Sequence, residues 1–596
     1  MTFSHVIRSS AIFGALLPIA ILAQSVAKDQ IQVHKKYSGI KSSPIDTNSL
    51  LVQIDETFNY QPIWPENPVS RTNIKGTPNK LIAGGLLQSS RGVLDKFFPA
   101  IDDTGWTPPD PDVAVGPNHV LAVVNSSISW FDKSGTKLFQ QTAGTFFSGM
   151  GAGSFIFDPK CFYDRVNQRY VMVFLEQDDS PQISKLLIAV SDDNNPTGTW
   201  HRYRMESMLT VGTQTFWLDY PGFGYNKDAY VVCGNMFGFS SGWAGVQFLV
   251  IPSAPLLSGG AATVSVLRDA NGGSAQVAEM ISPTASNVYA VSRSSSTSMR
   301  VYTVNNPGGT PSLQFSSVPV PANSGPTMNA ASTNGKTLSP VDDRVFNATW
   351  RNGRLVTSHN IQSGSFIATR WYQINTNGYP QAAPTLGQSG NVTSNQLHQF
   401  LSAISINAYD DISTVFAGSS TTVTANMLFA GRTSSDTTGS MGLPQILESS
   451  AGNNYSGFNG RWGDYFGVDV DPVDDLHFWG IGMTVNASNR WRTSIYKWRI
   501  SPAPKQITFS ENPVSAGSAT TMTVNLTSPA GPGGVTVTLR ALVKGLVRLP
   551  SSIFIPEGGM SGSGTIRTSN SQGALSVAIQ AAANSKSVTA TLNVTS

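Results

Sequence analysis

One pattern recurs seven times along this chain and limits its fold more than any other feature. An apolar strand, a polar turn and a second apolar strand follow one another at residues 113–124, 162–174, 223–235, 281–293, 345–360, 403–418 and 468–482. The turns carry Asn, Asp, Gly or Pro, which tolerate tight-turn geometry, so each stretch predicts a β-hairpin. The hairpins start 49 to 65 residues apart, a spacing typical of four-stranded sheets in a radial array. The sequence therefore predicts an all-β fold, with a β-propeller of about seven blades at residues 96–500.

A second kind of β pattern fills the end of the chain. After the Pro-containing linker near residue 500, residues 503–596 hold seven short runs of alternating polar and apolar residues and no cysteine. Short alternating strands at this density predict an immunoglobulin-like β-sandwich without the usual disulfide. The stretch NPVSAG at residues 512–517 resembles the opening of bacterial immunoglobulin-like modules, which implies a spacer or an adhesive attachment.

The first residues have the features of an export signal. His5 and Arg8 precede an apolar run from Ala11 to Ala23, which small residues follow. A run of this length is too short to span a bilayer, so residues 1–27 are predicted to be a secretory signal peptide. Residues 28–95 show no period and are predicted to be an N-terminal extension that packs on the propeller or stays partly loose. The mature protein is expected to be secreted, periplasmic or held at the cell surface, without a transmembrane anchor.

Composition excludes one class of partner and several classes of site. Only 13% of the residues are charged and the net charge is +3, which argues against a nucleic-acid surface. The two cysteines, Cys161 and Cys233, are either one disulfide or two buried thiols. The sequence holds no CxxC or HExxH motif, so zinc sites are not indicated.

An acid or a histidine stands where each hairpin begins. These residues are Asp112, Asp158, Asp219, Glu279, Asp342 with Asp343, His398 and Asp464. If the hairpins hold the innermost strands, these side chains surround one mouth of the central channel, where propeller ligands commonly bind. Like charges in such a ring must share protons, hold a cation or pair with arginine. Arg461, Arg344 and Arg165 are the candidates for pairing with these acids. The alternative is that each acid caps a loop or bonds to backbone N–H groups.

Two of these positions share a WxDY motif. Trp217 to Tyr220 and Trp462 to Tyr465 both have this form. An aromatic face beside a carboxylate suits a sugar ring, whereas the alternative is that these aromatics wedge between blades. The candidate catalytic residues are Asp158, Asp219, Asp464 and His398. The candidate substrate-binding residues are Trp217, Tyr220, Trp462, Tyr465, Arg461 and Asp112.

The acids that follow the last WxDY motif have another interpretation. Asp469, Asp471, Asp474 and Asp475 surround an Asp-Pro turn. An EF-hand loop needs a central glycine and a glutamate at its twelfth position, and neither is present. A solvated turn is the favoured interpretation, and a bound calcium ion is the alternative. The sequence indicates no other cofactor.

Several longer motifs resemble a known group. They are DPKCFYDRVNQRYVMVF (158–174), NPTGTWHRY (195–203), DYPGFGYNKDAYVV (219–232) and RWGDYFGVDVDPVDD (461–475). They resemble motifs of a largely uncharacterised group of exported bacterial β-propeller proteins, over about residues 100–500. The resemblance implies fold and export but no reaction, and Gly222 stands where the group's DYPK motif has lysine. SDDNNPTGTW (191–200) is loosely similar to the Asp-box of sialidase-type propellers, which implies fold only.

Three hypotheses about function follow. The first is an exported glycoside hydrolase or polysaccharide lyase, in which two ring carboxylates act as general acid and base, or His398 with a tyrosine abstracts a proton. The second is a non-catalytic lectin or adhesin. The third is a surface structural protein that calcium stiffens. The expected partner is an extracellular glycan or another cell-surface component; the sequence does not determine the oligomeric state.

Overall fold

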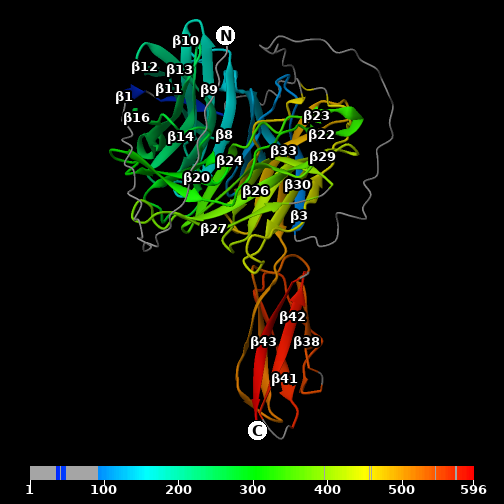
Figure 1. Ribbon diagram of the computed structural model, residues 1–596. Coiled ribbons are helices and arrows are strands. Elements are labelled where there is room, and N and C mark those ends of the chain that lie inside the picture. Colours follow the sequence, from blue (N-terminus) through cyan, green and yellow to red (C-terminus); the bar gives the residue numbers. More distant parts are fainter. Residues whose placement is uncertain are drawn as a thin grey trace, which may run out of the picture. The chain divides into compact units, whose positions relative to one another are not determined.

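The computed structural model describes residues 35–40, 42–47, 92–392, 394, 396–455, 457, 460–543, 545–570, 574–584 and 586–596. The predicted signal peptide lies outside these residues. The described chain is all-β: strands dominate it, and its two α-helices are single turns, α1 (Ala143–Phe146) and α2 (Ser253–Leu257) (Figure 1). None of the helices in the described part of the chain is long and apolar enough to span a bilayer.

Seven antiparallel sheet units follow one another in the part of the chain that the structure describes between residues 92 and 500. In units 1 to 6 the four strands pair in chain order, whereas the fourth strand of unit 7 comes from residues 92–102. In every unit the first strand lies on one side of the four and the second and third lie inside. Unit 1 consists of β4 (Asp112–Val115), β5 (His119–Val124), β6 (Ser127–Asp132) and β7 (Lys137–Thr142), and unit 2 of β8 (Ile156–Asp164), β9 (Arg169–Asp179), β10 (Gln182–Ser191) and β11 (Thr199–Glu206). Unit 3 consists of β13 (Gln214–Tyr225), β14 (Ala229–Gly238), β15 (Trp243–Pro252) and β16 (Ala262–Asp269), and unit 4 of β17 (Gln276–Val277), β19 (Val288–Ser295), β20 (Ser298–Asn305) and β21 (Ser312–Pro319).

The remaining units continue the pattern. Unit 5 consists of β24 (Val345–Arg351), β25 (Arg354–Ser363), β26 (Phe366–Asn375) and β27 (Thr385–Val392). Unit 6 consists of β28 (His398–Ile406), β29 (Ile412–Ser420), β30 (Val423–Arg432) and β31 (Gln445–Glu448), and unit 7 of β32 (Gly467–Val470), β33 (Phe478–Val485), β34 (Trp491–Ile500) and β3 (Gly92–Asp102). Short additions are β12 (Leu209–Val211) beside β13, the pair β22 (Ala330–Ala331) and β23 (Thr337–Leu338), and β18 (Glu279–Met280), which pairs in parallel with β13 and β24 and so links units 3 and 5.

The first strands of the units form a closed ring. β4 contacts β8, β8 contacts β13, and the contacts continue through β17, β24, β28 and β32 back to β4. Radial sheets whose inner strands meet in this cyclic way make a propeller-like architecture. The predicted hairpins coincide with the first antiparallel pair of the units. The exception is unit 4, where the first strand is only Gln276–Val277 and lies ahead of the predicted stretch.

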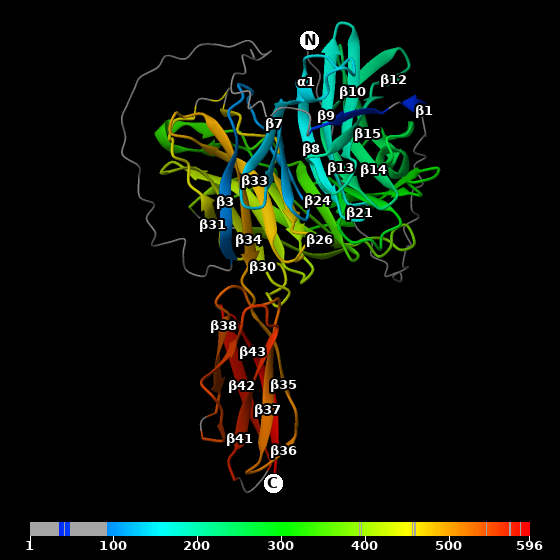
Figure 2. The ribbon, with the colours of Figure 1, turned by 180° about the vertical axis from the view of Figure 1, so that it is seen from behind.

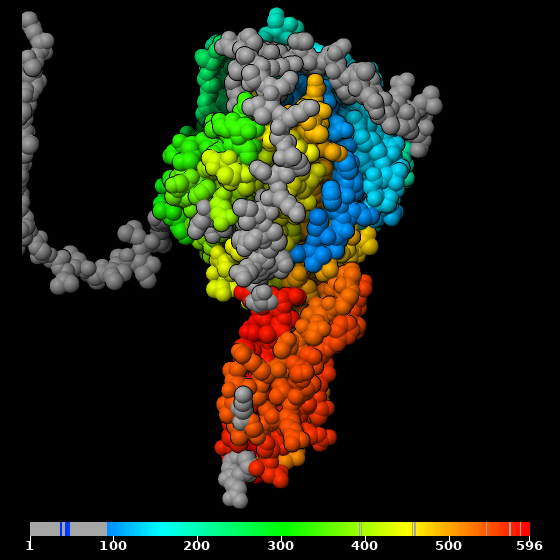
Figure 3. Space-filling view, turned by 90° about the vertical axis from the view of Figure 1, so that its right-hand side faces the viewer, coloured from blue at the N-terminus to red at the C-terminus, as the bar shows by residue number. Residues whose placement is uncertain are grey.

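The ring closes through a strand from far away in the sequence. β3 pairs antiparallel with β34 and becomes the outer strand of unit 7 (Figure 2). In the space-filling view its surface, in blue, lies next to yellow and orange surface from the end of the ring (Figure 3). Phe98 of β3 is buried and packs on Phe131 and Trp479, with ring centroids 5.5 Å and 6.5 Å away. Part of the predicted extension, from Gly92 to Asp95, therefore belongs to the ring.

Two more described segments of the predicted extension add outer strands. β1 (Lys35–Ile40) pairs with β16, and β2 (Ser43–Asp46) pairs with β11. They become the fifth strands of units 3 and 2. The extension was predicted either to pack on the propeller or to stay partly loose. These two described segments pack on the ring.

The C-terminal residues form two further sheets. One has the order β35-β37-β41-β39 and the other β36-β43-β42-β38-β40. Buried and exposed side chains alternate along β37 and β38, and both sheets contribute to one apolar cluster that includes Met522 and Val577. The strands are β35 (Pro504–Phe509), β36 (Val514–Ser515), β37 (Ala519–Leu526), β38 (Val535–Ala541), β39 (Val547–Arg548), β40 (Ser552–Ile555), β41 (Ser561–Thr568), β42 (Leu575–Ala583) and β43 (Lys586–Thr595).

Candidate functional site

The candidate site begins with irregularities in the inner strands. The pairing register of the first strand shifts in units 2, 3, 5 and 6, between Phe157 and Lys160, Asp219 and Gly222, Val345 and Ala348, and Phe400 and Ala403. Such bulges bend a strand and re-aim its side chains. Asp158 and Tyr220 have positive φ at two of these bulges, a conformation that costs about 1–3 kcal/mol for a non-glycine residue and that gathers at functional sites.

Four aspartates converge near the inner strands of units 1, 2, 3 and 7. We name Asp110, Asp158, Asp219 and Asp464 the carboxyl cluster. The backbone N–H of Asp464 donates to Asp110, 2.5 Å away. Asn125 connects two members: its Nδ2 donates to Asp110 at 2.7 Å, and its Oδ1 accepts from the backbone N–H of Asp158 at 2.7 Å. Units 1, 2, 3 and 7 and the segments just before them thus supply one site.

Burial and mutual repulsion raise the pKa values in the cluster. Burial, then the charge of Asp464, raises the pKa of Asp110 to about 8 and that of Asp219 to about 6. Burial, then the charge of Asp219, raises the pKa of Asp158 well above its usual range. Asp158 and Asp110 are buried, whereas Asp219 is half-buried. Near neutral pH the cluster therefore holds protons on its deeper carboxyls.

Arginines complete the site on its open side. Arg461, with 38% of its side chain exposed, forms an ion pair with Asp464, whose side chain is 20% exposed. Arg344 pairs with Asp342 at 2.7 Å and lies over the ring of Tyr220, at 4.5 Å. Arg461 and Arg344 thus take the pairing role predicted from the sequence. The site presents an arginine-paired carboxylate beside carboxyls that keep their protons, the two forms that general base and general acid catalysis need.

A second charged layer lies deeper in the ring. It consists of Asp112, Lys160, Glu279, Asp469 and Arg165, whose charges act on one another. The Lys160 ammonium lies 3.4 Å from the ring centre of Tyr465, and burial lowers its pKa. Asp112 accepts from the backbone N–H groups of Val113 and Cys161, at 3.0 and 3.1 Å. Asp112 was predicted to bind substrate. In the structure it is buried and holds backbone groups of units 1 and 2 instead.

The buried Asp112 carboxyl predicts a pH effect on stability. Burial raises its pKa to about 6, against about 3.9 in an unfolded chain. Between these pH values the folded state holds a proton that the unfolded state releases, so Asp112 lowers the free energy of unfolding as pH rises through this window. The Asp112→Asn variant should therefore gain about 2–3 kcal/mol relative to the unsubstituted protein from pH 4 to pH 6 and nothing more above it. Urea unfolding at successive pH values measures this difference; a difference that stays constant from pH 4 to 6 would contradict it.

The acids after the last WxDY motif are not all in a wet turn. Asp469 and Asp471 are buried. Asp469 accepts from the backbone N–H of Val115 at 3.0 Å, and Asp471 binds the Lys133 ammonium at 2.7 Å. The predicted solvated turn is therefore wrong for these two, because their partners come from units 1 and 2. For the calcium alternative, no group of three or more His, Cys, Asp or Glu side chains in the described chain is placed to hold a metal ion.

His398 does not join the carboxyl cluster. It is buried at the start of β28, where its Nδ1 accepts from the backbone N–H of Ile367 at 3.3 Å and its ring packs on Phe366. It borders a hollow of about 470 Å³ between turns of units 5 and 6. Its contacts are with unit 5, so the structure does not bring the candidate His398 together with Asp158, Asp219 and Asp464.

Three of the four predicted sugar-stacking aromatics have no exposed face. Trp462, Tyr220 and Tyr465 are buried. The hydroxyl of Tyr220 donates to the carbonyl of Val345 at 2.9 Å, and that of Tyr465 donates to the carbonyl of Pro159 at 2.7 Å. Each bond connects one unit with another, which fits the alternative that these aromatics wedge between blades. Trp217 differs, because it is only half-buried.

The cysteines and the other hollow are structural features. Cys161 and Cys233 are free and buried, so they are two buried thiols and not a disulfide.

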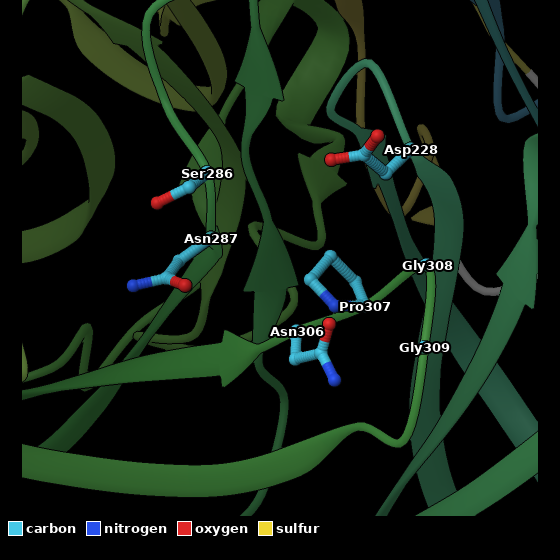
Figure 4. A pocket seen from close by; sticks show the side chains of 7 residues that line it. All are labelled: Asp228, Ser286, Asn287, Asn306, Pro307, Gly308 and Gly309. Carbon is cyan, nitrogen blue, oxygen red and sulfur yellow. The ribbon is translucent and has the colours of Figure 1, made fainter.

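A hollow of about 510 Å³ lies among turns of units 3 and 4, beyond the C-terminal end of β13; the side chains that line it are drawn in Figure 4. Its carboxylate, Asp228, pairs with Lys227 at 2.8 Å. At Gly222, a Cβ would lie 2.6 Å from the carbonyl oxygen of Ala275, so the lysine of the resembled motif has no room here.

Comparisons with known proteins give only distant likenesses. No protein-family model matches the chain, and no curated protein matches it. A solved protein of unknown function from Dyadobacter fermentans DSM 18053 is 9% identical, with a TM-score of 0.35, over 69% of this chain and 99% of that chain. An endo-arabinanase from Bacillus licheniformis is 12% identical, with a TM-score of 0.26, over 57% and 97%. The β-propeller domain of Nup133 from Vanderwaltozyma polyspora is 7% identical, with a TM-score of 0.30, over 69% and 100%.

Proposed function

We propose that this chain is an exported seven-bladed β-propeller, followed by an immunoglobulin-like sandwich, that binds and hydrolyses extracellular carbohydrate at the carboxyl cluster. The proposal includes secretion and membership of the exported bacterial group that its motifs resemble. The closed ring of first strands supports the propeller, and the two C-terminal sheets around one apolar cluster support the sandwich.

The observation that carries the proposal is the convergence of the carboxyl cluster, in which an arginine-paired, partly exposed Asp464 lies beside carboxyls whose pKa values burial raises. Asp464 pairs with Arg461 and reaches solvent. Asp219, half-buried nearby, has a pKa raised to about 6. A general acid works best with a pKa near the pH of the reaction, and cleavage of a glycosidic bond needs such an acid together with a carboxylate. Asp219 is therefore assigned as the general acid and Asp464 as the base or nucleophile.

The deeper carboxyls and the bulges support these roles. Burial raises the pKa values of Asp158 and Asp110, so these two carboxyls keep protons and limit the negative charge that the site accumulates. The bulge between Asp219 and Gly222 displaces the regular pairing at the point where the general acid is needed. Sugar hydroxyls supply both donors and acceptors, which matches a site that holds protonated and ionised carboxyls together.

A substitution series tests the assignment. The purified mature protein is screened on neutral and acidic polysaccharides, with reducing ends as the measured product. Asp464→Asn and Asp219→Asn should each lower kcat by about 10²–10⁴-fold, because either change removes one of the two proton-transfer groups. Asp178→Asn, at an exposed carboxylate near the end of β9, is the control and should keep full activity.

The same experiment separates catalysis from binding alone. Unchanged turnover in both variants would overturn the catalytic assignment. Binding of a glycan without any released product, in the unsubstituted protein, would favour a lectin or adhesin instead. The buried aromatics Tyr220, Trp462 and Tyr465 take no part in either outcome, since their rings are wedged inside the ring of sheets.

A further inference from the structure

A continuous row of aromatic rings leads away from the carboxyl cluster. Successive ring centroids lie 5.4, 4.7, 6.3, 5.7 and 5.2 Å apart. We name this set the aromatic row; its members, in order, are Trp106, Phe155, Phe157, Trp217, Phe237 and Trp243.

The outer half of the row is a cross-strand ladder. Trp217 on β13 stands opposite Phe237 on β14, and Phe237 stands opposite Trp243 on β15. Side chains on directly opposite residues of antiparallel strands project from the same face of a sheet. The row therefore crosses unit 3 from its innermost strand towards its outer strands, instead of following a single strand.

The row passes next to two members of the carboxyl cluster along strands β8 and β13. Phe157 directly precedes Asp158, and Trp217 lies two residues before Asp219. From these positions near the mouth, the rings become more accessible outwards: Phe157 is 6% exposed, Trp217 and Phe237 are half-buried, and Trp243 is 46% exposed. Core packing explains the inner rings, which border the apolar core between units 2 and 3. Trp243 ends the ladder on the outer side, with nearly half its surface in water, so the ladder presents an exposed aromatic next to two half-buried ones.

We propose that the outer part of the aromatic row, formed by Trp217, Phe237 and Trp243, binds successive pyranose rings of an extended β-linked polysaccharide, whose cleaved bond lies at the carboxyl cluster. The flat C–H faces of β-linked pyranoses match exposed aromatic edges and faces, while hydroxyl groups at the ring edges stay in water. This inference rests on the proposed function and names its substrate class: a polymer of several sugar units rather than a monosaccharide or a short terminal unit. Trp243 takes the unit farthest from the cleaved bond.

Binding of defined oligosaccharides tests the row. Titration calorimetry measures the affinity of cellohexaose, xylohexaose and chitohexaose, with the matching trisaccharides, for the full chain. Trp243→Ala should weaken the best hexasaccharide about tenfold, because it removes one stacking contact, and should leave the trisaccharide nearly unchanged. Phe554→Ala, at a 60% exposed aromatic of the C-terminal sheets, is the matched control and should bind as the unsubstituted protein does.

Further measurements separate the possible failures. Trp217→Leu, in the half-buried centre of the row, should weaken both lengths of oligosaccharide, and its melting temperature shows whether it is folded. Equal hexasaccharide affinity in Trp243→Ala and the unsubstituted protein would overturn the inference, even if Asp464→Asn abolishes turnover. If instead Asp464→Asn keeps turnover while Trp243→Ala loses affinity, the assigned catalysis fails and the row stands.

A polypeptide ligand or a second copy of the chain on the aromatic row would give different binding and sedimentation results. Tight binding of a proline-rich peptide such as decaproline, lost in Trp243→Ala while no hexasaccharide binds, would overturn the inference in favour of a polypeptide ligand. Conversion of a dimer to a monomer by Trp243→Ala, seen by sedimentation, would overturn it in favour of a second copy of the chain.

Discussion

Replacing Arg165 by alanine is expected to lower the free energy of unfolding by about 3–5 kcal/mol. Arg165 follows β8 in unit 2 and is only 11% exposed, yet its guanidinium lies 2.5 Å from Asp475 and 3.6 Å from Asp469. It also donates to the carbonyl of Val470. Without it, the buried Asp469 loses its cation, and an unpaired buried charge is among the most destabilising changes in a protein.

The measurement is equilibrium unfolding in urea near neutral pH, with a double variant as the control. Arg165→Ala combined with Asp469→Asn should recover part of the loss, because the charge that was left unpaired is gone. Arg165→Lys should lie between the two extremes, since an ammonium keeps the charge but cannot reproduce the planar fork. A loss below about 1 kcal/mol in Arg165→Ala would show that this contact between units 2 and 7 is not needed.

The second large effect is expected at the closing strand. Phe98→Ala should cost about 3–5 kcal/mol, because Phe98 is 8% exposed and packs on Phe131 of unit 1 and Trp479 of unit 7. Its neighbour Phe97 is 50% exposed, so Phe97→Ala removes a residue of the same kind and should cost about 1 kcal/mol or less. Thermal unfolding of the two variants compares them directly. Equal losses would mean that the buried side of β3 does not hold the ring closed.

Local signals predicted the strands and part of the site. The hairpins were predictable because their turns carry residues with special backbone preferences, and those turns occur where expected. Asp158, Asp219 and Asp464 were predictable as a group because each stands at the same place in its repeat. Asp110 was not, although it lies only two residues before Asp112; the structure turns Asp110 towards Asp464 and Asn125 and buries Asp112 beneath it.

The remaining errors have one physical cause. Whether an acid in a turn is wet depends on neighbours that the local sequence does not contain. Asp471 is dry because Lys133 reaches it from unit 1, a partner 338 residues away in the sequence. The closing role of β3 was missed for the same reason, because its partner strand lies near residue 500. Pairings over such distances leave no periodic signal in the chain.

The position of the closing strand near the start of the chain affects how the protein folds during its synthesis. The backbone N–H of Ile101 in β3 donates to the hydroxyl of Thr493, and these residues are separated by 392 positions. During synthesis, β3 leaves the ribosome long before β34 exists, so it waits without its partner while six other sheets are made. Contacts of such long range form slowly, and an unpaired edge invites wrong partners.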